Sequence, residues 1–145
     1  MNNSYQSLCD VFRGDRRTNL TAALMKQHRW PQGKASKAVD EYVMFLYVAS
    51  LNAGVHLVPT QEIDCVWEAD ILQSTAQYMQ TCQTLCGRVI HHAHVAELKQ
   101  AHASTDTESI DTEAAFATTQ TLFGQYFGET RLSRGLLPAA ACGVL

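Results

Sequence analysis

No run of apolar residues in the sequence is long enough to cross a membrane. The longest, Tyr42 to Ala49, has eight residues, whereas a membrane-spanning helix needs roughly 20. The first 15 residues also lack an apolar stretch preceded by basic residues, which is the form of a secretory signal. We therefore expect no membrane partner and a cytoplasmic location.

Neither sign of charge dominates. The chain has 11 basic and 14 acidic residues and a formal net charge of -3. Apart from a short group at Arg13, Arg16 and Arg17 and a looser one from Lys26 to Lys37, the basic residues are scattered, whereas nucleic-acid-binding proteins usually cluster them. We therefore expect no nucleic-acid partner.

Cysteine is too sparse for a disulfide framework. The chain has five cysteines, an odd number spread over its whole length. They are Cys9, Cys65, Cys82, Cys86 and Cys142. This distribution is typical of reduced thiols in a reducing compartment. We expect most of them to be packing residues.

Helical patterns dominate the rest of the sequence, and no convincing pair of strands occurs. The chain has 145 residues, 46% of them hydrophobic, which is enough for one compact domain. We expect a short helix around Leu20 to Gln27, capped by Thr18 or Asn19, and further helices at 36–52, 60–85 and 95–103. A last helix follows a Thr105-x-x-Glu108 capping box and ends near Gly128. The sequence therefore predicts an all-α domain of about five helices at 1–130, with the helix from Val39 to Leu51 buried at its centre. Residues 131–145 form an apolar, small-residue tail that we expect to be flexible.

The segment 60–85 carries carboxylates on a face that otherwise resembles a core face. Thr60 can cap this helix, and Gly87 can end it. Helical spacing places on one stripe Asp64, Glu68, Ile71, Thr75, Tyr78 and Cys82, with Trp67 and Leu72 beside it. Asp64 and Glu68 are one turn apart, close enough to bind one cation, clamp one arginine or share a proton. Asp70 points away from both.

These two acids have three interpretations. They can favour the helix dipole from a solvated face. Asp64 can instead be buried, where it caps a neighbouring backbone or pairs with an arginine such as Arg88. In the third interpretation the two carboxylates belong to a ligand site. The sequence leaves all three open.

Three histidines, His91, His92 and His94, follow Gly87 within a few residues. Imidazoles are common metal ligands, but such a cluster can equally be a solvated turn. Cys82 and Cys86 could join them in a zinc site, although packing is the ordinary role of such cysteines. We expect Asp64 and Glu68 to face His91 and His92, and the Trp67 ring to be buried with its N–H engaged.

The stretch from Asp64 to His92 resembles the conserved helix of the glycine-rich domain-containing protein-like family. The motif of that family is D-x-x-W-H-x-H-[IM]-L, followed by T-x-x-Y, a Cys, a Gly and a His pair. The residues that stand in those places are Asp64, Trp67, Ile71, Leu72, Thr75, Tyr78, Cys82, Gly87, His91 and His92. The similarity extends through "EYVMFL" and "TTQTLFGQYFG", from about Trp30 to Gly128. No activity is assigned to that family, so the resemblance implies a fold rather than a reaction.

One departure from the family pattern bears on metal binding. Glu68 and Asp70 stand where the motif has its two histidines. If those histidines bind a metal such as zinc in relatives, carboxylates at the same places favour harder cations or abolish binding.

Two classes of function follow. We favour a helical binding or adaptor protein that recognises a peptide or protein beside the Trp67/Tyr78 face, since no phosphate-binding loop, nucleophile elbow or other recognised catalytic signature occurs. The residues expected to contact that partner are Asp64, Trp67, Glu68, Tyr78, Cys82, His91 and His92. The alternative is a metal-binding protein or metal-dependent enzyme that holds a divalent ion with Asp64, Glu68 and His91 or His92.

Overall fold

The computed structural model describes residues 3–92 and 112–128. These residues form six α-helices and one short π-helical turn, and they contain no strand. The elements are α1 (Asn3–Val11), α2 (Asp15–His28), α3 (Gln32–Leu51), α4 (Gln61–Gln73), α5 (Thr75–Thr81), the π turn η1 (Cys82–Cys86) and α7 (Thr112–Phe127). The expected all-α class is confirmed, with six helices rather than about five.

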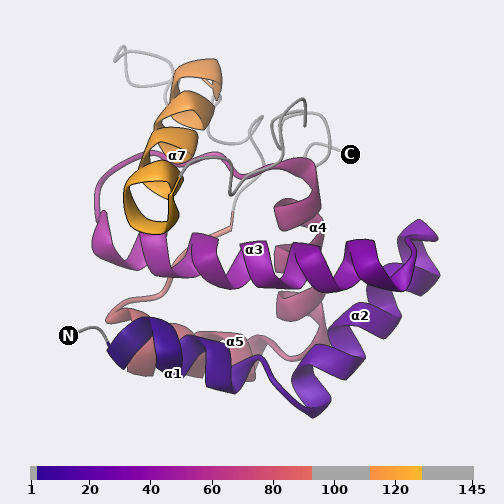
Figure 1. The fold of residues 1–145 in the computed structure, drawn as a ribbon. Coiled ribbons are helices and arrows are strands. Elements are labelled where there is room, and N and C mark those ends of the chain that lie inside the picture. Colours follow the sequence, from indigo (N-terminus) through magenta and orange to yellow (C-terminus); the bar gives the residue numbers. More distant parts are fainter. Residues whose placement is uncertain (1–2, 93–111, 129–145) are drawn as a thin grey trace, which may run out of the picture.

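Helix α3 is the centre of the fold. It runs across the middle of the molecule, with α1, α2 and α5 below it and α7 above it (Figure 1), and it packs against α1, α2, α4, α7 and η1. Every residue from Glu41 to Ala49 is buried, as expected of a helix that is apolar nearly all round. The prediction of a buried central helix is confirmed.

Helix α3 begins four residues earlier than the sequence pattern indicated, at Gln32 instead of Ser36. Pro31 lies directly before it, where the fixed φ of proline suits a helix start and its missing N–H costs nothing. The first turn is polar and exposed, so apolar periodicity could not reveal it.

The N-terminal region corrects the sequence prediction, which placed no helix before about residue 18. Helix α1 is short, and only a few apolar side chains, among them the fully buried Leu8, anchor it to the core. Helix α2 then begins at Asp15 rather than after a cap at Thr18 or Asn19. Gly14, with a φ of 64°, forms the corner between the two helices, a conformation that glycine adopts at little cost.

The prediction of one continuous helix at 60–85 is wrong, because the region is divided into α4, α5 and η1. Its start is as predicted, because the Thr60 side chain accepts the Ile63 N–H at 3.2 Å. Ser74 then leaves the helical conformation, and its hydroxyl accepts the Gln77 N–H at 3.1 Å to begin α5. Serine competes for backbone hydrogen bonds in this way, which favours helix starts over helix interiors. The chain ends this region at Gly87, as expected, with a φ of 79°.

Helix α7 ends at Phe127, directly before Gly128, as the sequence indicates. It is joined to the α3–α4 connection by the Thr119 hydroxyl, which accepts the Val58 N–H at 3.0 Å. The expected helix at 95–103, the Thr105-x-x-Glu108 capping box and the tail 131–145 lie outside the described residues. Among the helices at 3–92 and 112–128, none combines the length and apolar character needed to cross a membrane.

Candidate functional site

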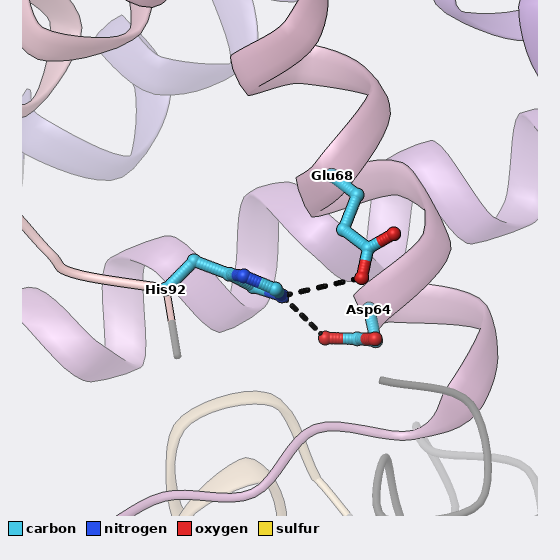
Figure 2. A group of neighbouring side chains, drawn as sticks. All are labelled: Asp64, Glu68 and His92. Carbon is cyan, nitrogen blue, oxygen red and sulfur yellow. Dashed lines mark hydrogen bonds and ion pairs between the residues drawn. The ribbon is translucent and has the colours of Figure 1, made fainter. Parts of the chain in front are cut away.

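Asp64, Glu68 and His92 converge on one point beside α4 (Figure 2). The two acids lie one turn apart on α4, and the histidine comes from the segment that follows η1. His92 Nε2 lies 2.7 Å from Asp64 Oδ1 and 3.9 Å from Glu68 Oε2. One ligand atom from each side chain can be chosen so that all three lie within 4.8 Å of one another.

The solvent exposure of the three side chains increases from Asp64 to Glu68. The side chain of Asp64 is only 4% exposed and that of His92 11%, whereas Glu68 is 39% exposed. The second carboxylate oxygen of Asp64, Oδ2, is buried and has no hydrogen-bond partner. An orphaned carboxylate oxygen in the interior is costly, because it has lost its water without replacement.

The environment of Asp64 excludes the first sequence interpretation and bears out only part of the second, namely that Asp64 is buried. Its carboxylate is buried, so it does not lie on a solvated face. Arg88, the suggested ion-pair partner, instead donates from Nη2 to the Ala49 carbonyl oxygen at 2.6 Å. The ligand-site interpretation stays a prediction.

His92 owes its position to a backbone clamp on Ile90. The Tyr78 hydroxyl donates to the Ile90 carbonyl oxygen. Tyr78 in turn accepts the Trp67 Nε1–H at 2.8 Å. The Ile90 carbonyl is therefore held two residues before His92.

The Trp67 ring completes the support of His92. The two rings meet edge to face, with centroids 4.7 Å apart and an interplanar angle of 80°, a favourable geometry for aromatic rings. Trp67 is buried and its N–H is bonded, so the prediction for this residue is confirmed. Burial is the main cause that raises the pKa of Tyr78, followed by the nearby Cys82 sulfur.

The other histidines and cysteines that the sequence suggested as ligands are not part of this cluster. His91 is exposed and is not part of the cluster, and His94 lies outside the described residues. In the part of the chain that the structure describes, the group of three potential metal ligands is Asp64, Glu68 and His92. Cys82 and Cys86 do not belong to it, so the structure gives no support to a Cys-Cys-His zinc site.

Asp70, which the helical spacing set apart, has a structural role that sequence reasoning missed. Its two oxygens accept from Arg16 Nε at 3.0 Å and Nη2 at 2.9 Å, and Oδ2 also accepts the Tyr42 hydroxyl at 2.8 Å. Arg16 Nη1 donates to the Thr81 hydroxyl at 2.8 Å. Burial and then the Asp70 charge raise the pKa of Tyr42. No local signal pairs Arg16 with an acid 54 residues away.

Comparison with known proteins yields no matching family model, curated protein or solved structure. The resemblance to the glycine-rich domain-containing protein-like family stays a prediction, based on the residues quoted for it. The function is therefore argued from the geometry of this chain alone.

Proposed function

We propose that the protein binds a divalent first-row transition-metal ion with Asp64, Glu68 and His92. The observation that carries the proposal is the buried Asp64 Oδ2, which has no hydrogen-bond partner and lies in the carboxylate that faces His92 (Figure 2). A cation is the simplest group that would satisfy this oxygen while also using the other two side chains.

The spacing of the donor atoms suits such an ion. Metal–ligand bonds of about 2.1 Å place neighbouring ligand atoms of an octahedral ion about 3.0 Å apart and opposite ones about 4.2 Å apart. The distances from His92 Nε2 to the two carboxylates, 2.7 and 3.9 Å, are of this size. The ligand atoms of all three side chains lie within 4.8 Å of one another, and Glu68 is the most exposed of the three.

The donor types narrow the choice of ion. Two carboxylates and one imidazole suit Mn²⁺, Fe²⁺ or Zn²⁺, whereas Mg²⁺ and Ca²⁺ prefer oxygen ligands alone. Three protein ligands leave positions on the ion for water or a small molecule, which would enter from the side of Glu68. An ion held in this way would supply a Lewis acid at the open end of the site, beside Glu68.

A peptide or protein partner beside Trp67 and Tyr78 has less support. Both side chains are buried, and their polar atoms are bonded to each other and to the Ile90 backbone. They support His92 from within rather than present a face for contact. That function stays a prediction.

Calorimetric titration with Mn²⁺ tests the proposed site. The full chain, purified without a chelating tag and stripped with a chelator, should bind one ion. Asp64→Asn, Glu68→Gln and His92→Gln should each weaken binding at least about tenfold, since even residues behind a metal ligand contribute that much. Each substitution keeps the size of the side chain and removes or weakens one ligand.

Matched controls lie beside the proposed ligands. Glu62→Gln changes another acid of α4, whose carboxylate lies 3.8 Å from Lys34 Nζ, and His91→Gln changes the exposed neighbour of His92. Both should bind Mn²⁺ like the wild type. Saturable binding that all three ligand variants retain, or no binding by the wild type, would refute the proposed site. Circular dichroism confirms that each variant keeps its helices.

A further inference from the structure

A cavity of about 300 Å³ lies between α1, α2 and α3, which is at the lower end of the range for small-molecule sites. Helix α1 contributes Tyr5 and Cys9, which lie one turn apart. Arg13 comes from the corner between α1 and α2, and Arg17 comes from the first turn of α2. None of the proposed metal ligands lines this cavity.

Helix α3 forms the floor of the cavity. It contributes Asp40, Val43 and Met44. Val43 and Met44 are 2% and 3% exposed, whereas the side chains of Asp40 and Arg13 are 61% and 66% exposed. The inner part is therefore apolar and the mouth is charged, a division that suits an amphipathic ligand.

The Tyr5 ring is a fixed aromatic wall. It meets the rings of Tyr47 and Phe127 at centroid distances of 5.2 and 5.1 Å. The sulfur-containing side chains of Cys9 and Met44 line the same cavity. Both aromatic rings and sulfur atoms pack favourably against a further aromatic ring. An aromatic ring is therefore the apolar group that these walls fit best.

The charges at the mouth favour an anion. Asp40 is already paired with Arg17, and Arg17 is also held by a hydrogen bond of 3.1 Å from Nη1 to the Ser36 hydroxyl. Arg13 pairs with Asp10 at 3.0 Å, and both of these side chains are more than half exposed. Because such a surface pair contributes little, Arg13 can turn to a ligand. A guanidinium binds a carboxylate with two parallel hydrogen bonds.

We propose that the cavity binds a small aromatic carboxylate. The carboxylate pairs with Arg13 at the mouth, and the ring packs on Tyr5, Val43 and Met44 inside. Two arginines and one aspartate line the cavity, so a ligand with a single negative charge balances them. Phenylacetate has this chemistry and serves as the probe.

Cys9 reports whether the cavity is occupied. Among the cysteines of the described residues it is partly exposed, whereas Cys65, Cys82 and Cys86 are buried. Trypsin cuts after Arg13, so peptide 1–13 carries Cys9 apart from every other cysteine of the chain. The rate at which iodoacetamide alkylates this peptide in the folded protein therefore follows access to the cavity.

The test titrates the full chain with phenylacetate in a calorimeter, after a chelator has removed any metal to which a carboxylate could bind. The wild type should bind one molecule with a Kd below about 1 mM, as expected for a ligand of this size. Bound phenylacetate should slow the alkylation of Cys9 in step with occupancy. Phenylacetamide has the same shape and no charge, and it should bind about tenfold more weakly, since hydrogen bonds to charged groups are the stronger ones.

Two variants locate the carboxylate. Arg13→Gln should weaken phenylacetate binding about tenfold, while Lys26→Gln, which removes the same charge from an exposed place on α2, should bind like the wild type. Circular dichroism checks that both keep their helices. No saturable binding by the wild type, equal binding of phenylacetamide, unchanged alkylation of Cys9 at saturation, or equal binding by the two variants would each overturn the proposal. The first three results do not depend on any variant.

Discussion

At the residue scale, the two buried aspartates of α4 differ in how their oxygens are satisfied. Both oxygens of Asp70 accept hydrogen bonds from Arg16, and one also accepts from Tyr42. Asp64 uses one oxygen for His92 and leaves the other without a partner. Glu62 also has a buried oxygen without a hydrogen-bond partner, but in the described residues only Asp64 combines such an oxygen with two further potential metal ligands, Glu68 and His92.

The sequence separated these two aspartates but did not reveal that both are buried. Helical spacing placed Asp64 with Glu68 and set Asp70 apart, and the structure keeps that separation. The spacing carries no information on burial, however, because Asp70 is covered by residues distant in sequence. The histidine partner of Asp64 was narrowed only to His91 or His92, and the choice depends on the clamp at Ile90.

The pKa of Cys82 should depend on Cys86. In Cys86→Ala the strongest donor to the Cys82 sulfur is gone, so the pKa should rise from about 6 toward the value of an ordinary thiol. The rate of Cys82 alkylation against pH, followed by mass spectrometry, measures this midpoint. Equal midpoints in wild type and variant would contradict this effect of Cys86.

The sign of the accompanying stability effect follows by linkage. The folded pKa of Cys82 lies below its unfolded value, so the contribution to the free energy of unfolding is full above the unfolded pKa and is lost as pH falls through about 6. The wild type should therefore gain stability from pH 6 towards neutrality relative to Cys82→Ala.

At the element scale, one buried ion pair joins three helices. Arg16 on α2 contacts Asp70 on α4 and Thr81 on α5, and the Phe12 ring lies 4.2 Å from its guanidinium carbon. Breaking a buried pair leaves a charge without compensation, which is more damaging than never having the pair.

Asp70→Asn should therefore destabilise the protein by about 3 to 5 kcal/mol. The control is Asp40→Asn, since Asp40 also pairs with an arginine, Arg17, but is 61% exposed; its loss should cost about 1 kcal/mol or less. Urea unfolding measures both. Similar losses in the two variants would show that burial does not distinguish these pairs.

Element boundaries followed from the sequence where a single residue dictates them. Thr60, Gly87 and Gly128 ended or began helices as expected. Ser74 was overlooked because apolar spacing continues through it, although its hydroxyl begins a new helix. Helix α1 was missed because its burial depends on contacts with α3 and η1, which no local pattern contains.

At the scale of the whole molecule, α3 holds the fold together. It packs against α1, α2, α4, α7 and η1, and the Phe45 ring meets the Trp67 ring at a centroid distance of 5.2 Å. The site therefore shares one core with the rest of the domain. The central helix was predictable because it is apolar nearly all round, and such a helix is buried in the core of a protein.

Phe45→Ala should destabilise the protein by about 3 to 5 kcal/mol, because it opens a cavity in a fully buried place. Leu72→Ala is the control, since Leu72 is 79% exposed, and it should change stability by no more than about 0.5 kcal/mol. Chemical unfolding followed by circular dichroism compares them. A loss within error at Phe45 would show that α3 is not the core.

The central claim is that Asp64, Glu68 and His92 hold one metal ion. Anomalous diffraction from crystals of the full chain grown with Mn²⁺ tests it most directly, because the signal locates the ion without reference to any variant. We predict one strong peak within bonding distance of a carboxylate oxygen of Asp64, a carboxylate oxygen of Glu68 and Nε2 of His92. A peak elsewhere only, or no peak at saturating Mn²⁺ with His92 still hydrogen-bonded to Asp64, would contradict the claim.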